Sequence, residues 1–478
     1  MAIRNCPLSE HARSQPTSIA LVLGNGEDLP YATLDARVSA VASQLVAAGL
    51  KPGDHVGLLL PNTWMHITLM WACFRCRLVA VPLSTRFPVS QVEKLMGHLR
   101  CKVLLVAEDR YNSDVTQVIA VDTFIREALA AKPVTIPVTV DVQKPATLLL
   151  SSGSTGLPKA ILHRWGNHYL SALGANENIP MKPGDRYLLS LPLYHVAGVA
   201  ILFRAFVAGA TVVLSDKKQP IAVQLASDEI THVSMVGTQL KRLLAAKANN
   251  RYEALQAILL GGSAISESLI TLAYKAGLPI HTSYGMTELA SQITATPPAA
   301  SLETLLTSGK LLNYRRLKLD ADGEILVKGA TRFLGYVSGE GLQKPFDETG
   351  WYRTGDVGRM DAAGNLVVEG RKDNMFISGG ENIHPEEIER ALQAHAAVIR
   401  AFVVPVPDET YGYRPVAFLD VSRDMPAPTV FETHLATRIA RFMNPIAYLP
   451  LAEDVTGEMK VSRKQLTTRA LAALASGS

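Results

Sequence analysis

The residues best suited to chemistry form one short run, Ser151 to Lys159, which reads Ser-Ser-Gly-Ser-Thr-Gly-Leu-Pro-Lys. An apolar run ends just before it, which is typical of a buried strand. Hydroxyl and backbone N–H groups can donate to an anion, glycines let the backbone come close, and Lys159 adds a positive charge. We therefore predict a phosphate-binding loop, although the Gly-Lys-Ser/Thr ending of a Walker A loop is missing. The alternative is a polar turn between a strand and a helix.

Three further segments carry groups that suit a nucleotide. Thr287 and Glu288 follow a predicted strand, where a hydroxyl and a carboxylate suit a phosphate oxygen and its Mg²⁺, or simply cap a helix. Asp356 ends the run Trp-Tyr-Arg-Thr-Gly-Asp and could bind ribose hydroxyls or shape a turn. Arg371 could bind the same sugar or a phosphate, because a guanidinium fork suits anions.

Composition limits the class of protein. With 478 residues the chain is too long for a single core, so two or three domains are expected. Hydrophobic residues make up 48% and charged residues 19%, as in ordinary globular proteins. A net charge of only +4 argues against a nucleic-acid partner or a polybasic membrane surface. We expect no signal peptide and no membrane span, because long uncharged apolar runs are missing.

The cysteines give an expectation about redox environment. Cys73 and Cys76 have the spacing of a redox or zinc pair, but they lie inside a predicted helix, and no second pair completes a zinc site. Buried, reduced, structural thiols are the favoured interpretation for these two, for Cys6 and for Cys101. The predicted location is therefore the cytoplasm.

Hydrophobic patterning predicts an α/β fold. Strands at 56–60, 79–82 and 103–106 alternate with helices at 65–78 and 89–99, which indicates parallel strands joined by crossover helices. The alternation resumes after residue 159, with strands at 187–191, 211–214, 232–236, 257–260 and 280–284. We predict two doubly wound βα subdomains, while residues 108–145 are less regular.

The hydrophobic pattern changes after residue 300. Hairpin patterns at 317–327 and 361–368 predict a β-rich subdomain. Beyond 370–373, a helix from residue 384, strands at 398–404 and 415–421, and helices at 429–442 and 462–475 predict a small α+β domain. The expected division is a large domain of residues 1–371 and a small mobile domain of residues 372–478.

The order of these segments, together with Gly457-Glu458-Met459-Lys460, resembles the adenylate-forming superfamily of acyl-CoA synthetases, luciferases and nonribosomal-peptide adenylation domains. The resemblance covers essentially the whole chain. It implies that a carboxylic acid is activated with ATP and Mg²⁺ and is then transferred to CoA, with a possible homo-oligomer as the working form.

The resemblance also implies roles for individual residues. The β- and γ-phosphates of ATP would be held by Ser151, Ser152, Gly153, Ser154, Thr155, Gly156 and Lys159. Tyr284 and the adjacent Gly285 would pack at adenine, with Gly261, Gly262 and Ser263 lining the adenine and acyl pocket. Thr287 would contact the α-phosphate, Glu288 would bind Mg²⁺, and Asp356 and Arg371 would hold the ribose.

In the small domain, Lys460 would reach the active site during adenylation, and Asp373 would be the hinge. The loop that contains Gly379 and Gly380 would line the path of CoA, unless it is only a tight turn. Removal of a single group that stabilises the transition state commonly slows a reaction by about 10²–10³-fold. The resemblance implies that Lys460 is delivered for adenylation and withdrawn for thioester formation, so its movement would separate the two half-reactions.

The acyl site is predicted from Leu191-Pro192-Leu193-Tyr194-His195, where His195 would lie beside the reacting carboxylate. Arg204 lies in an apolar helix, where an unpaired charge is costly. It could bind a second substrate carboxylate, form a salt bridge, or face solvent. Within the superfamily, the chain most resembles the o-succinylbenzoate–CoA ligases of menaquinone synthesis, on the segments 189–195, 238–244, 259–265, 374–381 and 457–463. This resemblance implies Ser190, Arg204 and Thr238 as pocket residues.

Two departures leave the acid open. Gly237 stands where proline is expected, and the stretch 296–313 is irregular. The alternatives are another aryl- or medium-chain acyl-CoA ligase and a catalytically silent nucleotide-binding protein.

Overall fold

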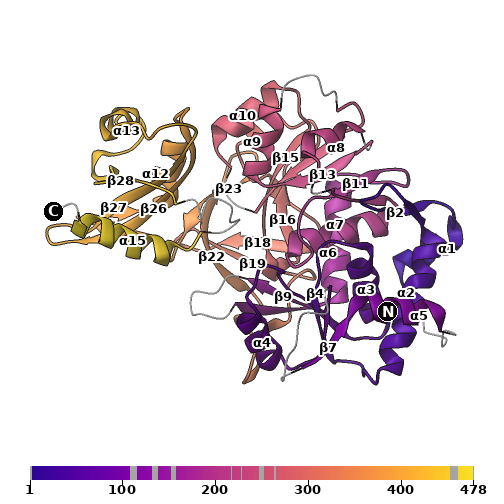
Figure 1. The fold of residues 1–478 in the computed structure, drawn as a ribbon. Helices are drawn as coiled ribbons and strands as arrows, with labels where there is room; N and C mark the ends of the chain where they lie inside the picture. Colours follow the sequence, from indigo (N-terminus) through magenta and orange to yellow (C-terminus); the bar gives the residue numbers. More distant parts are fainter. Residues whose placement is uncertain are drawn as a thin grey trace.

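The computed structural model describes residues 3–107, 116–131, 138–151, 158–216, 218–227, 229–246, 252–262, 265–379, 381–452 and 461–476. A large N-terminal body and a smaller C-terminal body lie side by side (Figure 1). Both bodies combine helices with sheets, which confirms the predicted fold class. Within the described ranges, no helix has the length and apolarity that a bilayer crossing requires.

The first large sheet has eight strands in the order β21-β20-β10-β9-β5-β4-β6-β7. The five strands from β9 to β7 run parallel, while β10, β20 and β21 continue the sheet antiparallel. The strands are β4 (His55–Leu59), β5 (Val79–Pro82), β6 (Cys101–Val106), β7 (Gln117–Ala120), β9 (Pro145–Ser151), β10 (Lys159–Arg164), β20 (Gly335–Ser338) and β21 (Gly341–Gln343).

The second large sheet has nine strands in the order β17-β16-β15-β14-β13-β11-β12-β2-β3. The run from β15 to β2 is parallel. The strands are β2 (Ile19–Val22), β3 (Asp28–Pro30), β11 (Arg186–Leu189), β12 (Thr211–Leu214), β13 (His232–Met235), β14 (Ala257–Leu260), β15 (Ile280–Met286), β16 (Ser291–Ala295) and β17 (Lys310–Leu311).

The two sheets share one core. Trp71 of α3 lies 5.2 Å from the ring of Phe203 and 4.9 Å from that of Phe206, both on α7, and all three are fully buried among residues of both sheets. The helices of the large body are α1 (Pro7–Ser14), α2 (Tyr31–Ala47), α3 (Trp64–Arg75), α4 (Val89–His98), α5 (Val121–Ala130), α6 (Trp165–Asn178), α7 (Val196–Ala208), α8 (Ile221–Ser227), α9 (Gly237–Ala245), α10 (Glu267–Lys275) and α11 (Leu302–Leu305).

Two smaller sheets follow. The predicted hairpins form an antiparallel sheet of β18 (Arg315–Leu319), β19 (Glu324–Gly329), β22 (Tyr352–Met360) and β23 (Leu366–Arg371). The C-terminal sheet contains β24 (Phe376–Ser378), β25 (Glu381–Ile383), β26 (Val398–Asp408), β27 (Gly412–Val421) and β28 (Tyr448–Pro450), with helices α12 (Pro385–Gln393), α13 (Pro428–Leu435) and α15 (Arg463–Ser476). A two-stranded ribbon pairs β1 (Ile3–Asn5) with β8 (Thr139–Asp141).

The structure differs from the sequence expectation at three points. Strands β2 and β3, which were not predicted, join the second sheet although they precede the first βα series, and β20 and β21 return to the first sheet from the β-rich region. Helix α5 lies in the stretch that has no regular pattern. The predicted helix at 429–442 ends at Leu435, and a 3₁₀ turn at Arg441–Met443 follows.

Candidate active site

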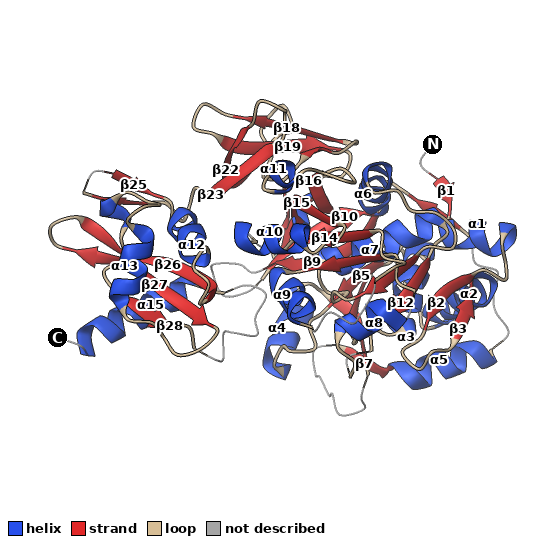
Figure 2. Cartoon of the chain, turned by 90° about the horizontal axis from the view of Figure 1, so that it is seen from above, coloured by secondary structure: helices blue, strands red, loops and turns tan. Residues whose placement is uncertain are grey.

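The carboxyl ends of four neighbouring parallel strands bring the candidate site together. Ser190, Gly261 and Tyr284 lie at or just beyond the ends of β11, β14 and β15, while α9, which carries Thr238, follows β13. In open α/β sheets this edge is where ligands bind. In Figure 2, the sheet of β18, β19, β22 and β23 lies above β15 and β16, and the small body lies to the left of α9 and α10.

The predicted phosphate loop connects two antiparallel strands. Ser151, the last residue of β9, pairs with Lys159, the first residue of β10. The loop therefore closes a hairpin, and the alternative of a strand-to-helix turn is wrong. Ser152, Gly153, Ser154, Thr155 and Gly156 lie outside the described residues. Lys159 is exposed, and its positive charge contributes to the lowered pKa of Asp373.

Glu288 is a buried carboxylate held by a phenol. Its Oε1 accepts a hydrogen bond of 2.8 Å from the hydroxyl of Tyr336, which lies 2.8 Å from the hydroxyl of Tyr352. Its backbone carbonyl accepts from the N–H of Phe333 at 2.8 Å. Among the described residues, no Lys, Arg or His forms an ion pair with Glu288, so the carboxylate is available to a cation.

The donor chemistry at Glu288 fits Mg²⁺. The described residues contain no cluster of three or more His, Cys, Asp or Glu side chains that could hold a metal. Mg²⁺ in nucleotide sites is usually held by one or two carboxylates and by the substrate's phosphates, with water completing the octahedron. A single buried carboxylate, held by a phenol near the start of β10, therefore meets the requirement.

The Thr287 turn is anchored by a buried histidine. Nε2 of His163, in β10, lies 2.7 Å from the carbonyl oxygen of Thr287 and donates to it. Burial lowers the pKa of His163 to about 4, so the imidazole is neutral near pH 7. Thr287 begins a 3₁₀ turn that runs to Leu289, and this bond ties the turn to the strand after the phosphate loop.

The predicted ribose residues form a connected chain of hydrogen bonds. Tyr284 donates its phenol to Asp356 at 2.5 Å, and Arg371 donates to the other oxygen of Asp356 at 3.2 Å. Asp356 and Arg371 are register partners in β22 and β23. Burial raises the pKa of Asp356, and the hydrogen bonds from Tyr284 and Arg371 oppose this rise.

The same arginine reaches the predicted hinge. Nε and Nη2 of Arg371 donate to the two carboxylate oxygens of Asp373 at 2.9 and 3.0 Å. These bonds lower the pKa of Asp373. Gly355 has φ +75°, and a Cβ there would lie 2.8 Å from Nη2 of Arg371, so glycine at this position leaves room for the guanidinium.

Arg204 is buried, with a side chain that faces only neutral acceptors. It donates to Asn176 Oδ1 at 3.0 Å, to the Tyr187 hydroxyl at 3.1 Å and to the Ile179 carbonyl at 3.3 Å. The residue is 2% exposed, so it does not face solvent, and the described residues give it no ion pair. Three of its five N–H donors are used by described residues, which leaves two for a ligand as far as the described residues go.

The uncompensated charge of Arg204 acts on two neighbours. Burial and, to a smaller extent, the positive charge of Arg204 together lower the pKa of His232 to about 4, against the opposing charge of Asp185. Burial also lowers the pKa of His281, with a smaller contribution from Arg204. A buried cation that also disfavours protonation of its histidines is well suited to an incoming carboxylate.

A hydrogen-bond chain extends from Arg204 toward the other predicted pocket residues. The Tyr187 hydroxyl lies 2.8 Å from the Ser234 hydroxyl, and Ser190 donates to the Ser234 carbonyl at 2.6 Å. His195 is half-buried at the start of α7, with its ring 4.6 Å from that of Tyr194. Thr238 is exposed near the start of α9.

Three further predicted site residues lie outside the described residues: Ser263 of the large domain, and Gly380 and Lys460 of the C-terminal part. Gly379 has φ +60° and directly follows the short strand β24, where its N–H donates to the Tyr411 carbonyl at 2.9 Å. Arg463, three residues after Lys460, forms ion pairs with Glu386 at 3.2 Å and Glu389 at 2.7 Å.

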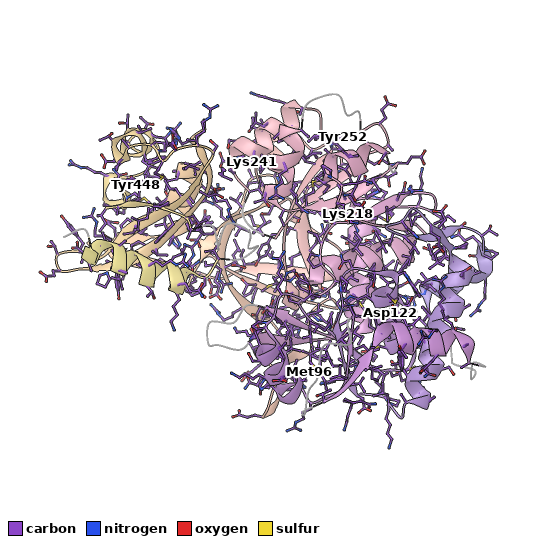
Figure 3. The ribbon with its side chains drawn as sticks, viewed as in Figure 1. Met96, Asp122, Lys218, Lys241, Tyr252 and Tyr448 are labelled. Carbon is purple, nitrogen blue, oxygen red and sulfur yellow. The ribbon has the colours of Figure 1, made fainter. Side chains whose placement is uncertain are left out.

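The two bodies also meet away from the hinge. Lys241 of α9 lies on the side of the large body that faces the small one (Figure 3). Burial lowers the pKa of Lys241, an effect opposed by the negative charge of Asp420 in β27. Ser268 of α10 donates to the carbonyl of Gln393 at the end of α12 at 3.4 Å.

Sequence reasoning missed Tyr336, His163 and Asn62. Asn62 bonds both the carbonyl of Leu191 and the N–H of Leu193, at 2.9 and 3.0 Å, and thereby fixes the loop before His195. These residues come from strands and loops that are distant in sequence, so no local motif marks them. Only Gly335-Tyr336, in a β-rich stretch, offered a weak signal of a constrained strand.

The sequence profile described as AMP-binding enzyme matches residues 8–337, and the profile described as AMP-binding enzyme C-terminal domain matches residues 387–457. The chain belongs to the AMP-binding enzymes. The adenylate-forming resemblance is thus confirmed for this AMP-binding enzyme. Its 2-succinylbenzoate–CoA ligase relative from Escherichia coli strain K12 is 35% identical over 450 residues, which cover 94% of each chain.

Solved structures show the same fold. The o-succinylbenzoate CoA synthetase MenE from Bacillus subtilis, in complex with the acyl-adenylate intermediate OSB-AMP, superposes with a TM-score of 0.89 at 32% identity, covering 98% of both chains. The same enzyme in complex with ATP and a magnesium ion gives a TM-score of 0.86, also at 32% identity, covering 94% of this AMP-binding enzyme and 96% of that chain.

Proposed function

We propose that the protein is an AMP-forming acid–CoA ligase that acts on o-succinylbenzoate, a dicarboxylate intermediate of menaquinone synthesis. The observation that carries the substrate is Arg204, a buried cation with no recorded acidic partner among the described residues. A dicarboxylate supplies one carboxylate to react and a second to pair with this charge. Relatives that are 30–35% identical and are named for this acid support the assignment.

In the first half-reaction, a carboxylate oxygen of the acid attacks the α-phosphorus of ATP, and the bond to pyrophosphate breaks. We assign the phosphates to residues 151–156 and Lys159, the α-phosphate to Thr287, and the adenosine to Tyr284, Gly285, Asp356, Arg371, Gly261, Gly262 and Ser263. Glu288 would hold Mg²⁺, which offsets charge on the triphosphate when bound. Lys460 would add a further cation in this step.

In the second half-reaction, the CoA thiol loses its proton, the sulfur attacks the acyl carbonyl carbon, and AMP leaves. We assign the path of the thiol to the loop with Gly379 and Gly380, and the hinge to Asp373 between domains 1–371 and 372–478. Arg371 contacts both the ribose carboxylate Asp356 and the hinge carboxylate Asp373, which supports coupling between nucleotide and hinge. Such closure is a hinge motion.

His195, Ser190, Thr238 and Arg204 form the proposed acyl site. The hydrogen-bond chain from Arg204 through Tyr187 and Ser234 to Ser190 supports a continuous polar wall. We further propose a cytoplasmic enzyme, in agreement with its four free cysteines, and a possible homo-oligomer.

Isotope exchange between pyrophosphate and ATP, measured with a panel of acids, tests this proposal. We expect exchange that depends on o-succinylbenzoate and AMP release once CoA is added. Exchange with benzoates or fatty acids alone would contradict the substrate, and no exchange with any acid would favour a silent nucleotide-binding protein.

A further inference from the structure

Tyr336 lies between the two charged groups that the phosphates of ATP require. Its hydroxyl donates to Glu288 Oε1 at 2.8 Å, and Nζ of Lys159 lies 5.2 Å from the centroid of its ring. The hydroxyl acts on the carboxylate, whereas the ring face acts on the ammonium. Because different parts of one side chain contact the two charges, substitution can separate their effects.

Strand pairing explains how Tyr336 reaches this place from 177 residues away. In the antiparallel pair β10–β20, Tyr336 is opposite Ile161, which shares a face of the strand with Lys159 two residues earlier. The preceding Gly335 has no room for a side chain, because a Cβ would lie 2.3 Å from the Gln343 carbonyl. The backbone of β20 is therefore closely fixed between β10 and β21.

The phenol of Tyr336 is a dependable donor. Its hydroxyl carries one proton to donate, and its hydrogen bond of 2.8 Å directs that proton to the carboxylate of Glu288. The Tyr352 hydroxyl lies 2.8 Å away and can donate to the oxygen of Tyr336. Tyr336 donates its hydrogen bond to Oε1 of Glu288. No described residue donates to Oε2, so this oxygen can bind a divalent cation.

We propose that Tyr336 is a positioning residue for the phosphate site: its hydroxyl fixes the orientation of Glu288 for a divalent cation, and its ring holds the Lys159 ammonium beside it. This inference rests on the proposed function for the identity of the ligand. It assigns a role to a residue that none of the nucleotide motifs contains.

Binding of Mn²⁺ and ATP without any acid tests the inference. Mn²⁺ is followed by its electron paramagnetic resonance signal, and ATP affinity is measured separately in EDTA. Tyr336→Phe removes only the hydroxyl, so we expect Mn²⁺ to bind the ATP complex about 10-fold more weakly, with unchanged metal-free ATP affinity. Tyr336→Leu also removes the ring, and we expect ATP to bind about 5-fold more weakly in EDTA as well.

Tyr314→Phe is the matched control, because it removes a hydroxyl that donates to Glu177, a surface carboxylate, at 3.1 Å. It should leave both affinities unchanged. Wild-type Mn²⁺ affinity in Tyr336→Phe would overturn the inference. If Tyr336→Phe does not fold, Tyr352→Phe replaces it, with about 3-fold weaker Mn²⁺ binding expected and unchanged binding as the contradiction.

The proposed function can fail separately. Because the probe contains no acid, a wrong acid leaves this comparison intact. If the wild-type protein binds no Mn²⁺ with ATP, the nucleotide site itself is misassigned, and both proposals fall.

Discussion

Lys159 is the residue at which the proposed phosphate loop can be tested by a single substitution. Its ammonium lies over the ring of Tyr336, and its charge contributes to the lowered pKa of Asp373, the proposed hinge residue. In the proposed reaction, negative charge grows on the pyrophosphate end of ATP only during adenylation.

We predict that Lys159→Ala slows adenylation by about 10²–10³-fold, as expected for loss of one transition-state donor. Thioester formation from preformed acyl-adenylate should fall less than about 10-fold. Rapid-quench assays of each half-reaction give both rates, with the exposed Lys102→Ala as control. Equal losses in the two half-reactions would mean that the loop is misassigned.

Arg204 gives the second residue-scale prediction. Arg204→Gln keeps some hydrogen-bonding capacity but removes the charge, so kcat/KM for o-succinylbenzoate should fall about 100-fold, comparable to loss of a charge-assisted bond of about 3 kcal/mol. Steady-state kinetics and a thermal melt distinguish lost recognition from lost folding. The exposed Arg423→Gln serves as control, and unchanged activity on the preferred acid in Arg204→Gln would refute a carboxylate-binding role.

At the scale of elements, the β22–β23 hairpin positions Asp356 and Arg371, the proposed ribose residues, through its register and one glycine. Gly355→Ala places a methyl 2.8 Å from Nη2 of Arg371, on a backbone with φ +75°. We predict that KM for ATP rises about 10-fold, because Arg371 must move away from Asp356.

Gly364→Ala is the matched control, since Gly364 has φ +79° in the same hairpin but no atom near its would-be Cβ. Both variants should lose about 1 kcal/mol of stability from backbone strain, while only Gly355→Ala should change KM. A similar KM in the two variants would show that the position of Arg371 is not controlled by this glycine.

The bounds of single strands were the structural feature that the sequence predicted best. Short apolar runs bounded by polar turns located β5, β12 and β14 at their observed bounds, because buried parallel strands leave that signature. Strand exchange between the sheets could not be predicted, since no local pattern records which sheet a strand joins. The same limit hid Tyr336, whose contact with Glu288 depends on the pairing of β20 with β10.

The sequence identified candidate site residues where each residue lies within a short motif of its own. Tyr284, Asp356 and Arg371, chosen from separate segments, meet through hydrogen bonds in the structure. Residues that only support the motifs, such as His163 behind Thr287 and Asn62 behind Leu191, carry no signature of their own, because a single buried histidine or asparagine is usually structural.

For the whole molecule, buried neutral histidines predict a pH-dependent stability. Burial lowers the pKa values of His66 and His163 to about 4, below the unfolded value of 6.5. Between these values the unfolded chain binds more protons, so the free energy of unfolding should rise with pH from about 4 to 6.5. Each histidine contributes up to about 1.4 kcal/mol per pH unit.

Urea unfolding between pH 4.5 and 7.5 measures this slope. Asp356 and Glu389 have the opposite effect on the free energy of unfolding at the acidic end of this range. Burial raises their pKa values, so the folded chain binds more protons there than the unfolded chain. His66→Gln should reduce the slope, since it removes one of the buried titrating groups. A stability that stays constant from pH 5 to 6.5 would contradict neutral burial of these histidines.

The most direct test of the whole account compares two acids that differ by a single carboxylate. CoA thioester formation is measured with ATP and Mg²⁺ for o-succinylbenzoate and for 4-oxo-4-phenylbutanoate, which lacks the carboxylate on the ring. A site with a buried cation should reject the analogue strongly. We predict a kcat/KM at least about 100-fold higher for o-succinylbenzoate, and equal values for the two acids would contradict the proposed function.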